Sequence, residues 1–171
     1  MSLERYPWLT PLWQQLLGQL RQGRLPQGLL LTGPTGVGKV ALARQLAQRW
    51  LCQGNEELPC GRCQSCQLWA AGSHPDFRLL KPEDNGRIGI DEVRSLQQQL
   101  ATTAYLGGRR VVVIDNAAQM TDNAANALLK TLEEPPSGTL LLLTVARRES
   151  LLATIISRCQ HWPLPQPDGT A

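Results

Sequence analysis

The residues with the clearest chemical potential form a glycine-rich segment, GPTGVGK, at positions 33–39. It matches the phosphate-loop pattern, a glycine-rich turn that ends in Gly-Lys between a strand and a helix. The glycines let backbone amides turn toward a polyphosphate, and the start of the next helix adds positive potential. The residues predicted to bind a nucleotide are Gly33, Thr35, Gly36, Gly38 and Lys39, with the lysine at the terminal phosphates.

Two positions near this loop lack the groups that ATP hydrolysis needs. Val40 stands where a Ser or Thr hydroxyl normally ligates Mg²⁺. Asp115 follows the apolar run 111–114 and suits the acid that orients Mg²⁺. The next residue is Asn116, whose amide cannot serve as a general base for the attacking water. We therefore expect no ATP hydrolysis, and the residues leave open whether the loop binds ATP or ADP or is only a packing corner of the sheet.

Four cysteines form a second group, and their spacing suits a metal ion. The pattern is C-x₇-C-x₂-C-x₂-C, at Cys52, Cys60, Cys63 and Cys66. Four thiolates favour tetrahedral Zn²⁺ and leave no open position, so we expect a structural zinc site. A four-iron cluster takes the same ligands and is the alternative. Cys159 is expected to be a small buried apolar residue, and His74 a turn residue that is redundant as a ligand.

Alternating strands and helices are predicted to position these groups. Apolar runs predict strands at 28–32, 77–80, 111–114, 140–145 and 161–162. Helical spacing and end signals predict helices at 12–20, 39–51, 91–105 and 121–134, with a short helix through 151–152. Asp91 and Thr121 are the expected caps, and Pro135-Pro136 ends the last long helix. This alternation predicts an α/β fold, a five-stranded parallel sheet with helices on both faces.

Length and composition set the broad class. The 171 residues suit one domain, which we place at 1–165, with the metal module inserted at about 52–66 and a Pro-rich linker at 166–171. The net charge of +3 is too small to argue for nucleic-acid binding. The sequence shows neither a secretory signal nor an apolar run long enough to cross a membrane. We expect a cytoplasmic protein without a membrane partner, where clustered cysteines favour metal over disulfides.

Several of these features occur together in a known family. The phosphate loop and the cysteine insertion are accompanied by ALLKTLEEPP at 127–136 and by Ser157-Arg158-Cys159. The chain resembles the clamp-loader subunits of bacterial DNA polymerase III, a branch of the AAA+ ATPases. YPWL at 6–9, AGSHPD at 71–76 and the altered ATP motifs resemble the delta-prime type more than the gamma/tau type. The gamma/tau type would carry Ser or Thr after the lysine and Glu after the aspartate.

The resemblance implies a fold, partners and roles for further residues. It implies an AAA+ phosphate-loop domain, the first of three, within a DNA polymerase assembly that places a sliding clamp on primed DNA. The implied partners are gamma/tau and delta subunits, and the domain alone is expected to be monomeric. Arg158 would reach the ATP of a neighbouring gamma/tau subunit, and Thr144 would match a residue that senses the gamma-phosphate. A local ion pair is the simplest role for Lys130 with Glu133 or Glu134, and an interface or DNA-facing role stays open.

Two other functions remain as alternatives. One is an active ATPase of the gamma/tau type with unusual motor residues, against which Val40 and Asn116 argue. The other is a zinc module that binds nucleic acid, for which few aromatic or basic residues surround the cysteines. ATP turnover with Mg²⁺ would favour the first, and salt-dependent DNA binding would favour the second.

Overall fold

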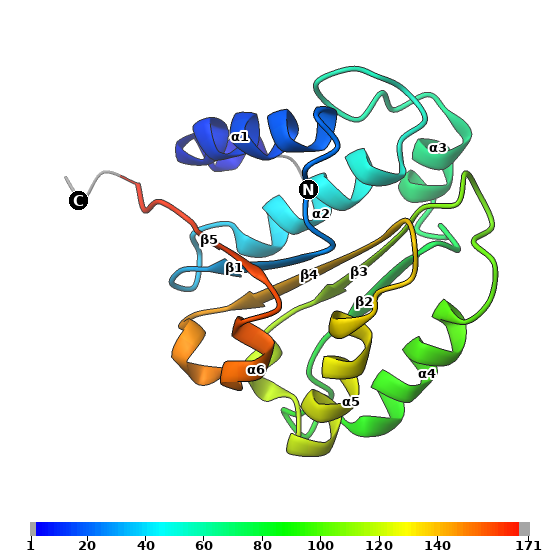
Figure 1. Ribbon diagram of the computed structural model, residues 1–171. Coiled ribbons are helices and arrows are strands. Elements are labelled where there is room, and N and C mark those ends of the chain that lie inside the picture. Colours follow the sequence, from blue (N-terminus) through cyan, green and yellow to red (C-terminus); the bar gives the residue numbers. More distant parts are fainter. Residues whose placement is uncertain (1–2, 168–171) are drawn as a thin grey trace.

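Five parallel strands form the centre of the computed structural model, which describes residues 3–167 (Figure 1). The strands are β1 (Gly28–Thr32), β2 (Phe77–Leu80), β3 (Arg110–Ile114), β4 (Thr139–Val145) and β5 (Gln160–Pro163). Their order across the sheet is β2-β3-β4-β1-β5, and all four pairings are parallel. The predicted five-stranded parallel sheet is therefore confirmed.

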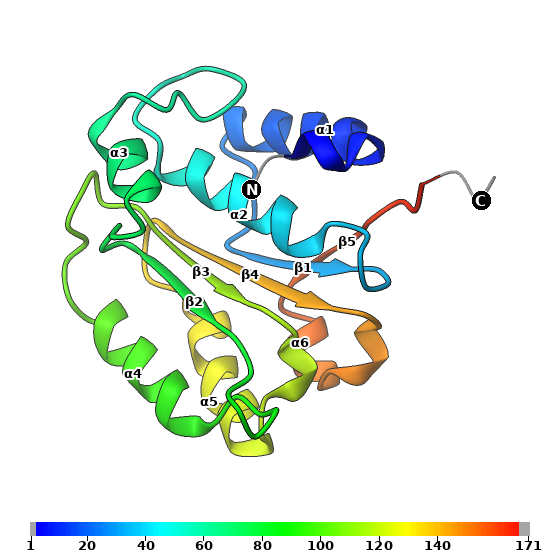
Figure 2. The same cartoon turned by 180° about the vertical axis from the view of Figure 1, so that it is seen from behind.

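Helices cover both faces of this sheet. The α-helices are α1 (Thr10–Arg21), α2 (Lys39–Leu51), α3 (Gln64–Ala70), α4 (Ile90–Leu100), α5 (Asp122–Glu133) and α6 (Ala153–Ile156). Figures 1 and 2 show α1, α2 and α3 on one side of the sheet and α4, α5 and α6 on the other. Short 3₁₀ helices occupy Leu3–Arg5, Pro7–Leu9, Ala117–Gln119 and Arg148–Ser150. None of the helices in residues 3–167 is long and apolar enough to span a membrane.

The central strands β1, β3 and β4 are mainly apolar because helices cover both faces of the sheet there. Successive side chains of a strand point to opposite faces. Leu29 and Leu31 therefore belong to the core under α1 and α2. Leu30 belongs to the core under α4 and α5. The central strands β1, β3 and β4 are buried along their whole length.

The ends of α5 and α4 test the helix caps that the sequence predicted. Thr121 caps α5 as predicted, because its hydroxyl accepts a hydrogen bond from the Ala124 amide at 3.1 Å. The cap predicted at Asp91 is wrong, since α4 starts after Gly89 without a side-chain cap. This helix also ends at Leu100 rather than at 105, and the backbone amides of Tyr105 and Leu106 instead donate hydrogen bonds to the buried carboxylate of Asp76.

Two further helix predictions need correction. The short helix expected through 151–152 exists but starts later, as α6, and residues 151–152 separate it from a 3₁₀ turn at Arg148–Ser150. Helix α3 was not predicted, since the glycines, prolines and cysteines around it suggested a loop throughout. Cys63 caps α3 with its sulfur, which accepts a hydrogen bond from the Cys66 amide.

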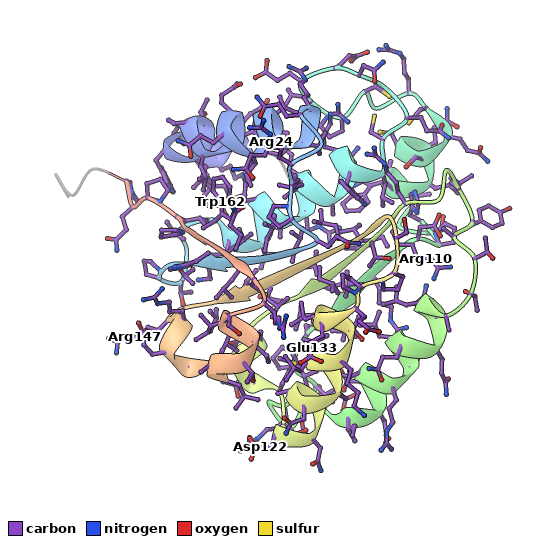
Figure 3. All side chains as sticks on the ribbon, viewed as in Figure 1. Arg24, Arg110, Asp122, Glu133, Arg147 and Trp162 are labelled. Carbon is purple, nitrogen blue, oxygen red and sulfur yellow. The ribbon has the colours of Figure 1, made fainter. Side chains whose placement is uncertain are left out.

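The parallel arrangement divides the candidate residues between two edges of the sheet. The phosphate loop, Asp115 and Thr144 lie at the carboxyl ends of β1, β3 and β4. Arg158 and the cysteine loop lie toward the opposite edge, where the strands begin. In Figure 3, Arg147, which follows β4, marks the edge where the strands end, and Arg110, which starts β3, marks the edge where they begin. The predicted linker at 166–171 stays a prediction, and its positions 168–171 lie outside the described residues.

Candidate functional site

The phosphate loop joins β1 to α2 at the carboxyl edge of the sheet. Gly38 has a φ of 105° and directly precedes the helix. A Cβ at Gly38 would lie 2.8 Å from Cδ1 of Tyr6, so both backbone conformation and close packing require glycine there. The Trp8 indole fixes the other side of the loop by donating a hydrogen bond to the Val37 carbonyl at 3.0 Å. The N-terminal segment therefore holds the loop in shape.

A cavity of about 520 Å³ opens over this loop. Its size falls in the range of sites that bind small molecules, about 300–1,000 Å³. The predicted residues that line it are Thr35, Gly36, Gly38, Lys39, Asp115 and Thr144. Gly33 belongs to the loop but does not line the cavity. The structure thus brings together six of the seven residues predicted to contact a nucleotide.

Lys39 is the cation of this cavity. Its ammonium donates hydrogen bonds to the Gly33 and Pro34 carbonyls of its own loop. Burial lowers the pKa of Lys39 from its ordinary value, and the nearby charge of Asp115 opposes that shift. An anion at the loop would favour the charged ammonium, which is the form that binds phosphate.

Asp115 and Thr144 form a small polar network at the ends of two neighbouring strands. The fully buried Thr144 hydroxyl donates to Oδ1 of Asp115 at 3.0 Å. The same hydroxyl accepts a hydrogen bond from the backbone amide of Asn116 at 2.9 Å. Asn116 has a φ of 56°, the only positive φ of a non-glycine in residues 3–167. The network therefore fixes the turn that directs Asp115 and Asn116 to the cavity.

Val40 and Asn116 both line the cavity, next to Lys39 and Asp115. A valine side chain has no oxygen for a Mg²⁺ ion, and an asparagine amide accepts no proton from water at neutral pH. The surroundings of Lys39 fit a nucleotide phosphate. The positions that would assist metal-dependent hydrolysis carry side chains without the required chemistry.

The four cysteines predicted to bind metal converge in space. The Sγ atoms of Cys52, Cys60, Cys63 and Cys66 all lie within 4.8 Å of one another. The Cys60–Cys66 and Cys63–Cys52 sulfur pairs are each 4.0 Å apart. Four sulfurs around Zn²⁺ with bonds of about 2.3 Å lie about 3.8 Å from each other. The cluster therefore fits a tetrahedral ion with little movement.

Backbone amides surround these sulfurs. The Arg62 and Cys63 amides donate to the Cys60 sulfur at 3.4 and 3.3 Å, and they lower the Cys60 pKa to about 6. Burial has the opposite effect on Cys66 and raises its pKa to about 12. A divalent cation would stabilise both thiolates, because metal binding and thiol deprotonation are linked.

The surroundings of His74 and Cys159 resemble those predicted, a turn for His74 and the apolar core for Cys159. His74 is buried, its Nδ1 accepts from the Asp76 amide at 3.0 Å, and its Nε2 pairs with the Ser65 hydroxyl at 2.9 Å. It is thus a turn residue that also connects α3 to the start of β2, and burial lowers its pKa. Cys159 is half-buried against the core under α5 and α6, and burial raises its pKa to about 11.

Arg158 follows α6 and precedes β5. Its side chain is exposed, and within residues 3–167 its guanidinium forms no hydrogen bond or ion pair. Its backbone is fixed, because its amide donates to the Ile155 carbonyl and its own carbonyl lies beside Gly28. Gly28 begins β1 and the phosphate loop follows the end of β1, so Arg158 lies away from the cavity over that loop.

The simplest expectation for Lys130 is wrong. Lys130, Glu133 and Glu134 are exposed, and no ion pair joins the lysine to either glutamate in the described part of the chain. Lys130 instead lines a shallow cavity between α4 and α5. Figure 3 shows Glu133 and Asp122 at opposite ends of α5.

Comparison with known proteins assigns the family. The family model described as DNA polymerase III, delta subunit, matches residues 8–168. The chain belongs to this family. Curated relatives named DNA polymerase III subunit delta' are 47% identical in Yersinia pestis, 46% in Pseudomonas aeruginosa and 44% in Escherichia coli. They match 95–97% of this chain, and the chain spans about half the length of these delta-prime relatives.

Related proteins of other types agree with the fold. A gamma/tau subunit of DNA polymerase III from Mycobacterium bovis is 34% identical. The match covers 84% of this chain and 25% of the length of that subunit. A solved gamma subunit-related protein from Thermotoga maritima superposes with a TM-score of 0.68 and 28% identity, over 90% of this chain and 47% of that one. The RuvB branch migration motor of the same organism shares the fold, with a TM-score of 0.55 at 16% identity. The match covers 91% of this chain and 43% of that protein.

Sequence reasoning missed how the N-terminal segment contributes to the site. Tyr6 lines the cavity over the phosphate loop and packs on Gly38, while the Trp8 indole donates a hydrogen bond to the Val37 carbonyl. These aromatic residues follow no motif for phosphate binding. Their contacts depend on a chain reversal that brings position 6 beside position 38, which local periodicity does not encode.

Proposed function

We propose that this chain is the AAA+-type domain of a delta-prime subunit that helps to place a sliding clamp on primed DNA. Its partners in that assembly are gamma/tau and delta subunits. The family assignment over residues 8–168 and the similarity to a gamma subunit-related structure support this role. The domain serves as a binding and regulatory partner rather than a motor.

The nucleotide cavity of this subunit binds ATP or ADP without hydrolysing it. The observation that carries this proposal is the position of Val40 and Asn116 on the cavity wall, beside an intact Lys39 and Asp115. Loss of a general base alone costs on the order of 10²–10⁴ in rate. Loss of a hydroxyl ligand further weakens the binding of Mg²⁺, the ion that offsets the negative charge developing on the phosphate.

Arg158 is proposed to complete the ATP site of a neighbouring gamma/tau subunit. A guanidinium offers a planar fork of donors and stays charged at all working pH values, which suits a gamma-phosphate. Its exposure, its free donors and its distance from the chain's own cavity support contact with another molecule. Such an arginine contributes about 10³–10⁵ in rate in other NTPases.

The four-cysteine cluster is proposed to hold one structural Zn²⁺. The convergence of the four sulfurs supports this, and four protein ligands leave no coordination position for a substrate. The ion would fix the loop that leaves α2 and would anchor α3, whose cap is Cys63.

Calorimetric titration with ATP, followed by a turnover assay with Mg²⁺, tests the proposed cavity. We expect saturable ATP binding, no turnover above background, and binding weakened at least about tenfold in Lys39→Ala, because a charge-assisted contact to phosphate is lost. Lys130→Ala is the matched control, since that exposed lysine lies on α5 away from the loop. ATP turnover that Lys39→Ala abolishes would show an active ATPase and contradict the proposal.

A further inference from the structure

A second cavity lies at the other edge of the sheet, beside the cysteine loop. Its volume is about 470 Å³, and three arginines line it, Arg21, Arg49 and Arg109. Arg21 comes from the last turn of α1, Arg49 from the last turn of α2, and Arg109 directly precedes β3. Figure 1 shows α1 and α2 ending near the cysteine loop, so residues far apart in sequence surround one space.

The charged groups that line this cavity are the three arginines, together with the sulfur of Cys52, which would be negative as a thiolate. No Asp or Glu lines it, and in residues 3–167 none of the three arginines forms an ion pair with a carboxylate. Each arginine donates to a backbone carbonyl instead. These contacts are Arg21 to Asn55 at 3.4 Å, Arg49 to Glu56 at 2.8 Å, and Arg109 to Trp50 at 3.2 Å. Neutral carbonyls orient the side chains without cancelling their charge.

Arg49 is the most informative of the three. Only 4% of its surface is exposed, although an arginine is almost never buried without a charged partner. A guanidinium has five N–H donors, and Arg49 uses only the Nε donor in the described structure. Arg109 is held by a second contact, since its guanidinium lies 4.6 Å from the centre of the Trp50 ring. The cationic groups are thus pre-positioned by the fold.

The neighbouring thiolates do not account for this arrangement. Cys52 borders the cavity, but its sulfur accepts hydrogen bonds from the Gly54 and Cys60 amides. None of the three guanidinium groups donates to a cluster sulfur among the described residues. Helix C-termini favour arginine in the last turn and explain part of the placement of Arg21 and Arg49. They do not explain why Arg109, from a separate loop, joins the same space.

We propose that this cavity is a phosphate-binding site, separate from the phosphate loop and assembled by Arg21, Arg49 and Arg109. Phosphate oxygens are the acceptors that best match forked guanidinium donors, and a cavity wall without carboxylates favours an anion. Gln53 and Asn55 also line the space and add polar groups at its rim. The phosphate belongs either to a nucleic-acid backbone or to a free phosphate or small phosphorylated molecule.

NMR detection of arginine side-chain signals tests this site in the 171-residue chain. Lys39→Ala serves as the background, because it weakens binding at the phosphate loop. Sodium phosphate is titrated against sodium chloride at equal ionic strength, and a short single-stranded oligothymidine without a terminal phosphate is titrated separately. We expect saturable shifts with phosphate. Arg21→Gln and Arg109→Gln should each weaken binding about tenfold or more, since each removes a charge-assisted contact.

Arg24→Gln is the matched control, because Arg24 is exposed and follows α1 without lining the cavity. It should leave phosphate binding unchanged. Competition of the oligothymidine with phosphate for the same signals would identify the nucleic-acid backbone as the source, whereas phosphate binding alone would identify a small ligand. Absence of saturable phosphate binding, or binding by Arg21→Gln and Arg109→Gln that is as tight as in the Lys39→Ala background, would overturn the proposal. Either result is independent of the ATP titration at Lys39.

Discussion

Single side chains explain how the cavity over the phosphate loop keeps its shape. Thr144 bridges Asp115 and the Asn116 amide, so the ends of β3 and β4 are fixed relative to each other. The sequence predicted Asp115, because an acid after a buried strand is a recognisable pattern. It could not predict that Thr144 would bridge both groups, since that contact depends on the register of β3 and β4.

Thr144→Val is expected to destabilise the domain while preserving the volume of the side chain. The Asn116 amide would lose its acceptor and Asp115 would lose a donor, which costs about 1–3 kcal/mol in the free energy of unfolding. Urea denaturation measures this difference. Thr103→Val, at an exposed position between α4 and β3, should change the free energy of unfolding by less than about 0.5 kcal/mol. An unchanged stability in Thr144→Val would show that the network contributes nothing.

Among the elements, the cysteine loop is only partly supported by hydrophobic packing. Cys60 and Cys63 are half-buried, and the loop between α2 and α3 contains exposed Leu58. The spacing of the four cysteines predicted their convergence correctly. It did not predict α3, because a helix of seven residues capped by a cysteine sulfur has neither a usual cap nor a clear apolar period.

Cys63→Ser is expected to remove both a zinc ligand and the cap of α3. Elemental analysis of the purified protein should show about one zinc per chain in the parent and much less in the variant. The melting temperature should fall, since metal binding contributes directly to folding. Cys159→Ser should keep the zinc, because Cys159 packs on the other side of the sheet. Equal metal content in Cys63→Ser and the parent would exclude the predicted four-sulfur site.

At the scale of the whole molecule, the parallel sheet separates the edge that carries the phosphate loop from the edge that carries Arg158 and the arginine-lined cavity. The order of strands and helices followed from periodicity, since each central strand is a short apolar run buried on both faces. Individual side-chain contacts across the sheet did not follow, because they depend on which strands become neighbours. The sequence places β1 first, whereas the fold places it between β4 and β5.

We propose that this chain has no hydrolytic site of its own and supplies Arg158 to a neighbouring subunit. The most direct measurement is ATP turnover by a reconstituted assembly of gamma/tau, delta, clamp, primed DNA and a full-length subunit that carries Arg158→Ala. We predict unchanged assembly by size and a turnover at the adjoining site that falls by up to about 10³-fold. Arg158→Lys should restore turnover only in part, because lysine lacks the forked donors of a guanidinium. Arg24→Ala is the control and should have the turnover of the parent. Turnover at the parent's rate in the assembled Arg158→Ala complex would contradict the proposed role of Arg158.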